Sequence, residues 1–145
     1  MNINDGNVYG KKLKKENILF YLDYGYLIVP NLIPPEDIAI LKKETVEIFR
    51  GNRGKIEGLL DVKNETDEEV LKKYVAIHFP HKISPLIKDF LSHKNITEVL
   101  SKIISPNVKC MQSMLFVKAP GKAGQAWHQD EYYIPTRDQS LVGAW

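Results

Sequence analysis

Through the first two thirds of the chain, apolar residues recur three or four positions apart, a spacing that predicts helices. Residues that commonly begin or end a helix bound each apolar segment. Gly25 suits a left-handed end to a short first helix over residues 18–24. Four later helices are predicted to begin at Pro35, at the capping box of Thr66 and Glu69, at Ser84 with Pro85, and at Asn95 with Glu98. The helical part of the chain is therefore expected to end near residue 105.

The pattern changes after Pro106. Residues 108–118 are rich in β-forming residues and methionine and lack helix caps, so one long strand is predicted there. Residues 126–130 are expected to be extended, and residues 141–145 to begin another strand. A short strand is also predicted at residues 26–29. Helices followed by strands are typical of an α+β fold.

Alternation along the predicted strand 108–118 separates two faces. One face carries Gln112, Met114, Phe116 and Lys118. This mixture suits the wall of a cavity better than a dry core, where an unpaired amide or ammonium group would be costly. The same period places His128 and Asp130 on one side of their extended segment and turns Gln129 away.

Composition limits the class of protein. The 145 residues are enough for one domain, with 43% hydrophobic and 26% charged residues, as in ordinary globular proteins. A net charge of +2 is too balanced to indicate a nucleic-acid partner. The basic run of residues 11–15 leads into an apolar helix and is interpreted as a solvated helix start. Nothing approaches the length of a membrane span, so no membrane partner is expected.

The cysteine content points to a reducing compartment. Cys110 is the single cysteine, which excludes an internal disulfide and favours a cytoplasmic protein. It lies in the apolar run 108–117, which predicts a buried, unreactive thiol.

The pair His128 and Asp130 carries the candidate chemistry. Ferrous iron in oxygenases is held by two imidazoles and one carboxylate on one face, which leaves three positions open. A histidine and an aspartate two apart on an extended segment could supply two of these ligands. Taken alone, the pair is a weak signal, and a histidine and an aspartate that meet by chance in a polar loop are the favoured interpretation.

Other candidate residues have competing interpretations. His78 and His81 could form a metal pair, but Pro80 between them argues against a shared helix face and favours loop histidines near the mouth of a pocket. Tyr132 and Tyr133 could contact a substrate, although packing near the site entrance is the favoured interpretation. His93 is interpreted as a surface residue at a helix end.

The residues around the pair form an ordered set of motifs. Its members are Tyr24 to Ile33 with Pro35-Glu36-Asp37, Gln112-Ser113-Met114, Lys118 to Gly121, Trp127 to Glu131, and Gly143-Ala144-Trp145. Together they resemble the phytanoyl-CoA dioxygenase family over about residues 17–145. The ordered set is far more specific than any single motif.

The resemblance implies a non-haem Fe(II), 2-oxoglutarate-dependent oxygenase on a double-stranded β-helix, a relative of the jelly roll. Such enzymes decarboxylate 2-oxoglutarate to succinate and usually hydroxylate a small organic substrate. Carried over by position, His128 and Asp130 would be iron ligands. The resemblance further implies that Met114 and Trp145 approach the co-substrate and that Gln112 lines the same cavity, while Lys118 lies on the matching strand face. Halogenating relatives lack the carboxylate, so Asp130 favours hydroxylation.

The chain departs from the family pattern after the His-x-Asp motif. The family's second histidine ligand and the basic residue that binds the far carboxylate of 2-oxoglutarate lie well downstream, and Arg137 follows the motif too closely to match. We therefore expect residues 1–145 to be a single partial domain, the truncated amino-terminal portion of such an oxygenase, inactive by itself. The alternative is a non-catalytic relative that acts as a weak binding module, or a remnant without function. Neither the substrate nor the oligomeric state follows from the sequence.

Overall fold

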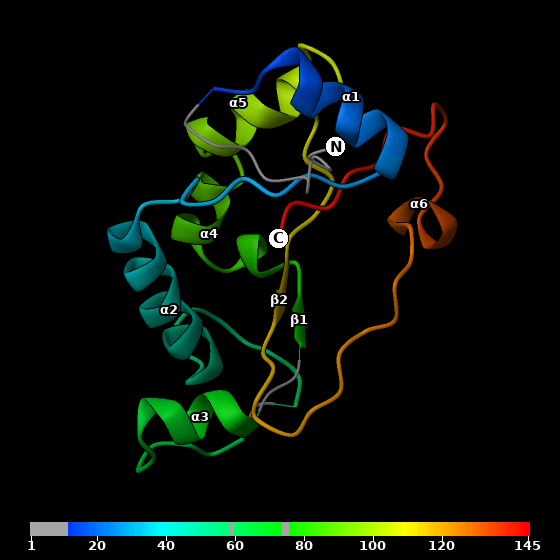
Figure 1. Ribbon diagram of the computed structural model, residues 1–145. Coiled ribbons are helices and arrows are strands. Elements are labelled where there is room, and N and C mark those ends of the chain that lie inside the picture. The colour runs from blue at the N-terminus through cyan, green and yellow to red at the C-terminus, as the bar shows by residue number, and fades with distance from the viewer. Residues whose placement is uncertain (1–11, 59, 74–75) are drawn as a thin grey trace. The chain divides into compact units, whose positions relative to one another are not determined.

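The computed structural model of the protein describes residues 12–58, 60–73 and 76–145. Within these ranges the helices are α1 (Lys15–Tyr24), α2 (Pro35–Phe49), α3 (Asp67–Lys73), α4 (Pro85–Phe90), α5 (Lys94–Ile103) and α6 (Asp130–Tyr133), with a 3-10 turn η1 (Pro80–Lys82) (Figure 1). The strands β1 (Ala76–His78) and β2 (Met114–Phe116) pair in antiparallel orientation. The described part of the chain is therefore α+β, as expected.

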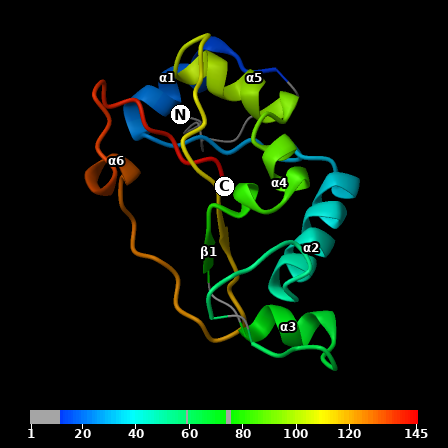
Figure 2. The ribbon, with the colours of Figure 1, turned by 180° about the vertical axis from the view of Figure 1, so that it is seen from behind.

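The described residues divide into two compact units. Unit 1 contains the residues up to Pro35, His93–Lys109 and His128–Trp145, and so carries α1, α5 and α6. Unit 2 contains Glu36–Ser92 and Cys110–Trp127, and so carries α2, α3, α4, η1 and the two strands. The views in Figures 1 and 2 both show β1 beside β2 within unit 2. None of the helices in the described residues is long and apolar enough to cross a membrane.

Local signals place the helix ends. The backbone N–H of Gly25 donates to the carbonyl of Tyr21 at 2.8 Å, and Gly25 has a φ of 76°, which confirms the predicted left-handed end of α1. At α4, the Ser84 hydroxyl accepts a hydrogen bond from the N–H of Ile87 at 3.1 Å, and Pro85 follows it, as predicted. The Lys14 and Lys15 side chains are exposed at the start of α1, while Lys11 lies outside the described residues.

One predicted cap is wrong. The residue before α5 is His93, whose Nδ1 accepts from the N–H of Asn95 at 3.3 Å. Asn95 instead donates from Nδ2 to the carbonyl of Leu32 at 2.7 Å, within unit 1. The amide side chain of Asn95 thus contacts a residue distant in the chain. The cap of α5 needs only a nearby hydrogen-bond acceptor, and His93 provides it.

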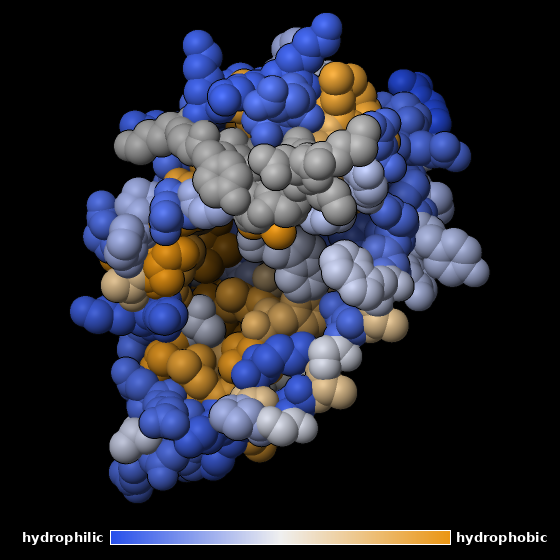
Figure 3. All heavy atoms as spheres, viewed as in Figure 1, coloured by the Kyte–Doolittle hydropathy of each residue, from blue (hydrophilic) through white to orange (hydrophobic). Residues whose placement is uncertain are grey.

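The core of unit 2 forms around the second half of α2. Its fully or nearly buried members are Val46, Ile48, Phe49, Val62, Val70, Ile77 and Ile87. Ile77 on β1 pairs with Leu115 on β2, and both Leu115 and Val117 pack against this core. The opposite face of β2 therefore carries Met114 and Phe116, in agreement with the predicted alternation. Figure 3 shows apolar side chains on the viewed face of unit 2, over α2 and the strands.

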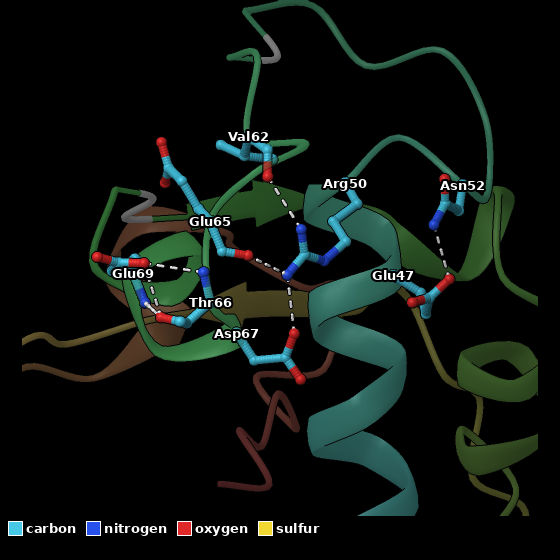
Figure 4. A network of polar contacts seen from close by, with 8 residues as sticks. All are labelled: Glu47, Arg50, Asn52, Val62, Glu65, Thr66, Asp67 and Glu69. Atoms are coloured by element: carbon cyan, nitrogen blue, oxygen red, sulfur yellow. Dashed lines mark hydrogen bonds and ion pairs between the residues drawn. The ribbon is translucent and has the colours of Figure 1, made fainter.

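Arg50 at the end of α2 ties the following loop to the start of α3 (Figure 4). Its guanidinium donates to the carbonyls of Val62 at 2.9 Å and Glu65 at 2.8 Å, and to the carboxylate of Asp67 at 2.8 Å. A planar guanidinium presents several N–H groups in fixed directions, so one side chain can satisfy three acceptors. Arg50 is therefore used structurally.

The predicted strands are mostly shorter than expected or absent. Of residues 108–118 only Met114–Phe116 form a strand, and residues 26–29 contain a single bridge residue, Ile28. Residues 141–145, where a strand was predicted to begin, are irregular. In the segment 126–130, which was expected to be extended, Gln129 is extended and Asp130 begins α6. A strand requires a hydrogen-bonded partner, and β1, the partner of β2, is itself only three residues long.

The predicted burial of Cys110 is also wrong, because its thiol is exposed. The residue lies in the part of 108–118 that forms no strand, so it is not carried into a core.

The capping box of α3 gives a first testable result. Glu69 accepts from the N–H of Thr66 at 2.8 Å, and the Thr66 hydroxyl accepts from the N–H of Glu69 at 3.3 Å (Figure 4). We expect Thr66→Ala to lower the free energy of unfolding by about 1 kcal/mol, because an N–H of the first turn loses its acceptor. Urea denaturation followed by circular dichroism measures this. Thr97→Ala, inside α5, is the matched control, and an equal loss there would contradict a capping effect.

Candidate metal centre

The side chains of His128 and Asp130 meet in unit 1. His128 Nε2 lies 3.1 Å from Asp130 Oδ1, and the two side chains are 26% and 34% exposed. The local backbone differs from the expected extended segment, since the chain turns into α6 at Asp130. Gln129 turns to another side, where its Nε2 lies 3.0 Å from the position a Cβ would take on Gly25. The imidazole and the carboxylate are therefore adjacent, although His128 precedes α6 and Asp130 is its first residue.

Helix α6 places an aromatic ring against the imidazole. The Tyr133 ring meets the His128 ring edge to face, with 5.5 Å between ring centroids, and Tyr132 meets Tyr133 at 5.2 Å. Tyr132 and Tyr133 are 83% and 68% exposed, so both lie at the surface beside the pair. The edge-to-face contact places Tyr133 directly beside the imidazole.

Trp145 and Asp130 come together around Gly143. A Cβ on Gly143 would lie 2.7 Å from Asp130 Oδ2 and 2.9 Å from Trp145 Nε1, both too close for a real carbon atom. The absence of a side chain at residue 143 thus allows the backbone to approach the carboxylate.

The remaining three predicted site residues belong to unit 2. Gln112 Nε2 lies 3.7 Å from Met114 Sδ, so these two side chains are in contact. Lys118 Nζ donates to the carbonyl of Ala123 at 2.9 Å and so spans the loop after β2. The six predicted residues therefore form two groups of three, with His128, Asp130 and Trp145 in unit 1.

The other histidines have separate surroundings. His81 in η1 approaches the Ser113 hydroxyl with Nδ1 at 2.7 Å, and His78 is an exposed residue at the end of β1. An open cavity of about 510 Å³ in unit 2 is lined by Arg50, Asn52 and residues 60–63. Within the described ranges, no three His, Cys, Asp or Glu side chains are grouped to hold a metal ion. His128 and Asp130 supply an imidazole nitrogen and a carboxylate oxygen, which fit two positions of a ferrous site.

Sequence reasoning missed Glu131, which follows the pair directly. Its carboxylate accepts hydrogen bonds from the Thr136 N–H and hydroxyl and, at 2.9 Å, from the N–H of Leu141. These bonds, with the Thr136 backbone N–H foremost, lower the pKa of Glu131 below its ordinary value. Sequence periodicity does not predict these contacts, because residues 134–141 form no helix or strand.

Comparison with known proteins identifies the class. The profile of the family described as Phytanoyl-CoA dioxygenase (PhyH) matches residues 21–145. The chain belongs to the phytanoyl-CoA dioxygenase family, which confirms the resemblance drawn from the motifs.

Relatives with curated names agree with this family. A phytanoyl-CoA dioxygenase of Arabidopsis thaliana is 24% identical, over 92% of this chain and 58% of its own length. The human peroxisomal phytanoyl-CoA dioxygenase is 28% identical, over 95% of this chain and 42% of its own. A probable alpha-ketoglutarate-dependent hypophosphite dioxygenase of Stutzerimonas stutzeri is 26% identical, over 84% and 43%.

The chain spans about half the length of these relatives. No solved structure matches it significantly. The cytoplasmic location stays a prediction, since some relatives are named as peroxisomal.

Proposed function

We propose that the chain supplies the His128–Asp130 part of the iron centre of a 2-oxoglutarate-dependent dioxygenase that hydroxylates a small organic substrate. One observation carries the proposal: an imidazole nitrogen and a carboxylate oxygen lie 3.1 Å apart, in a chain that matches the family over residues 21–145. The name of the Stutzerimonas relative supports 2-oxoglutarate, which is alpha-ketoglutarate, as the co-substrate.

The residues around the pair have definite roles in this proposal. Neutral His128 offers a nitrogen lone pair and Asp130 an anionic oxygen, both suited to Fe(II). When bound, ferrous iron would supply dioxygen activation coupled to oxidation of 2-oxoglutarate. In this proposal Tyr133 limits rotation of the His128 ring, whose Nε2 lies 3.1 Å from Asp130 Oδ1. Halogenating relatives lack a carboxylate at this position of the motif, so Asp130 favours hydroxylation.

The residues near 2-oxoglutarate are proposed from their positions in the motifs of the family. Met114 and Trp145 match positions that approach 2-oxoglutarate in the family pattern, Gln112 matches a cavity-lining position, and Lys118 lies on the matching strand face. We assign no described residue as the third iron ligand or as the basic residue that binds the far carboxylate of 2-oxoglutarate. We further propose that residues 1–145 form one partial domain, in which the helices and β1–β2 are the first elements of a double-stranded β-helix.

Metal titration tests the iron assignment. We expect His128→Ala to weaken anaerobic Fe(II) binding at least about tenfold, because one of the two protein ligands is removed. Isothermal titration calorimetry of the 145-residue chain, carried to millimolar Fe(II), measures the dissociation constant. His78→Ala removes an exposed imidazole of unit 2 and is the matched control. Equal affinities of wild type and His128→Ala would exclude the site and favour a relative that does not bind iron there.

A further inference from the structure

Glu131 closes a loop that begins and ends beside Asp130. Its Oε1 accepts from the Thr136 hydroxyl at 2.8 Å and from the Thr136 N–H, and its Oε2 accepts from the Leu141 N–H at 2.9 Å. One carboxylate thus binds backbone five and ten residues further along the chain. Figure 1 shows this loop as the segment that follows α6.

A second layer of bonds supports the loop from inside. The Thr136 hydroxyl, held by Glu131, accepts from the N–H of Ser140 at 3.2 Å, and the Ser140 hydroxyl donates to Asp138 at 2.8 Å. The position of Leu141 therefore depends on Glu131 both directly and through Thr136. Between the end of α6 at Tyr133 and Leu141 the backbone is irregular, so no helix or strand holds Leu141 in place.

The residues after Leu141 reach the candidate iron ligand. Two residues further on, Gly143 approaches Asp130 so closely that a Cβ there would lie 2.7 Å from Oδ2. The other oxygen of the same carboxylate, Oδ1, faces His128 Nε2 at 3.1 Å. The Asp130 carboxylate thus has the His128 imidazole beside one oxygen and the backbone of Gly143, which follows the Glu131 loop, beside the other.

We propose that Glu131 and Gly143 are positioning residues for Asp130: Glu131 closes the loop of residues 131–141, and Gly143 then holds the Asp130 carboxylate with Oδ1 turned toward His128. The inference rests on the proposed function, in which Asp130 ligates iron. Fixing a ligating carboxylate by neighbouring contacts raises metal affinity, since less freedom is lost on binding.

The loop closure is testable without metal. In Glu131→Gln, the amide Nε2 cannot accept a hydrogen bond, so either Thr136 or Leu141 loses its acceptor. We expect amide hydrogen exchange to rise about tenfold or more at whichever of Thr136 and Leu141 loses its acceptor, with α5 unchanged. Asp138→Asn alters the same loop but not the bonds of Glu131, and should leave Leu141 at the wild-type rate. Unchanged exchange at both Thr136 and Leu141 in Glu131→Gln would overturn the closure.

The effect on Asp130 is read with Co(II), whose visible absorption reports its ligand geometry. We expect Glu131→Gln and Gly143→Ala each to weaken Co(II) binding by about threefold to tenfold and to shift the bound-Co(II) spectrum toward that of Asp130→Ala. Asp138→Asn should keep wild-type affinity and spectrum. A residue that only stabilised the fold would lower the unfolding temperature and leave the spectrum unchanged.

The outcomes separate the two proposals. If the wild type shows no specific metal binding, or if His128→Ala binds metal as tightly as the wild type, the iron site fails and the positioning role fails with it. If His128→Ala weakens binding while Glu131→Gln and Gly143→Ala retain the wild-type spectrum, the positioning role alone is wrong. Should Glu131→Gln unfold, Thr136→Val removes the hydroxyl and keeps the carboxylate. A wild-type Co(II) spectrum in both Thr136→Val and Gly143→Ala would then overturn the inference.

Discussion

Replacing Phe49 with alanine is expected to lower the free energy of unfolding by about 3 to 5 kcal/mol. Phe49 is the last residue of α2, and its side chain has no exposed surface. Truncation removes most of the buried ring and leaves a cavity that Val46, Val70 and their neighbours fill only in part. Since domains are stable by about 5 to 15 kcal/mol, this one change removes a large share of the total.

Urea denaturation followed by far-ultraviolet circular dichroism measures the loss at Phe49. Ile40 is the matched control, because it lies on the same helix with 46% of its surface exposed. Ile40→Ala should change the free energy of unfolding by no more than about 0.5 kcal/mol. Similar losses for the two variants would show that α2 does not bury the face described here.

Removing the carboxylate of Glu44 is expected to cost about 2 to 3 kcal/mol. Its two oxygens accept from Arg53 Nε and Nη2 at 2.8 Å each, and Oε1 also accepts from the Ser84 hydroxyl at 2.6 Å. The Glu44 side chain is only 7% exposed, so water cannot replace these partners easily. Bidentate pairing with a guanidinium is among the stronger polar contacts in proteins. The carboxylate joins α2 to the loop after it and to the cap of α4.

Glu44 also predicts how stability depends on pH. The hydrogen bond from Arg53 lowers the pKa of Glu44 below its ordinary value of 4.5, while burial opposes this. The unfolded chain therefore takes up this proton at a higher pH than the folded chain does. The contribution is complete above pH 4.5 and is lost as the pH falls through the lower folded pKa.

Stability measured from pH 7 to pH 3 tests the role of Glu44. We expect the wild type to lose stability across the acid range more steeply than Glu44→Gln, which carries no titrating group at this position. Glu68→Gln on α3 removes an exposed carboxylate paired with Lys72 and serves as the control. An acid dependence of Glu44→Gln equal to that of the wild type would contradict the assignment.

Local signals in the sequence predicted the helix ends because the interactions that form them span three or four residues. The Thr66 and Glu69 capping box, the Ser84 cap and the left-handed Gly25 each involve the residue itself and its immediate neighbours. The cap of α5 shows the limit of such signals. Asn95 had the right residue type, but its amide bonds Leu32, 63 residues earlier in the chain.

Strands were less predictable because pairing is decided elsewhere in the chain. The composition of residues 108–118 favours β structure throughout, yet the strand extends only over the three residues that pair with Ala76–His78. The exposure of Cys110 follows from the same cause. Alternation nevertheless assigned the faces of β2 correctly, since side chains of any strand point to opposite sides.

By itself, the sequence determined the family, the helices and the identity of the His128–Asp130 pair. The reason is that ordered motifs and short-range hydrogen bonds depend on residues that are close together in the sequence. Only the tertiary structure decided that the two side chains meet at a helix start, that Gly143 lies against Asp130, and that Glu131 closes the loop between them. Those contacts join residues up to 13 positions apart through irregular backbone, where no periodic pattern exists to reveal them.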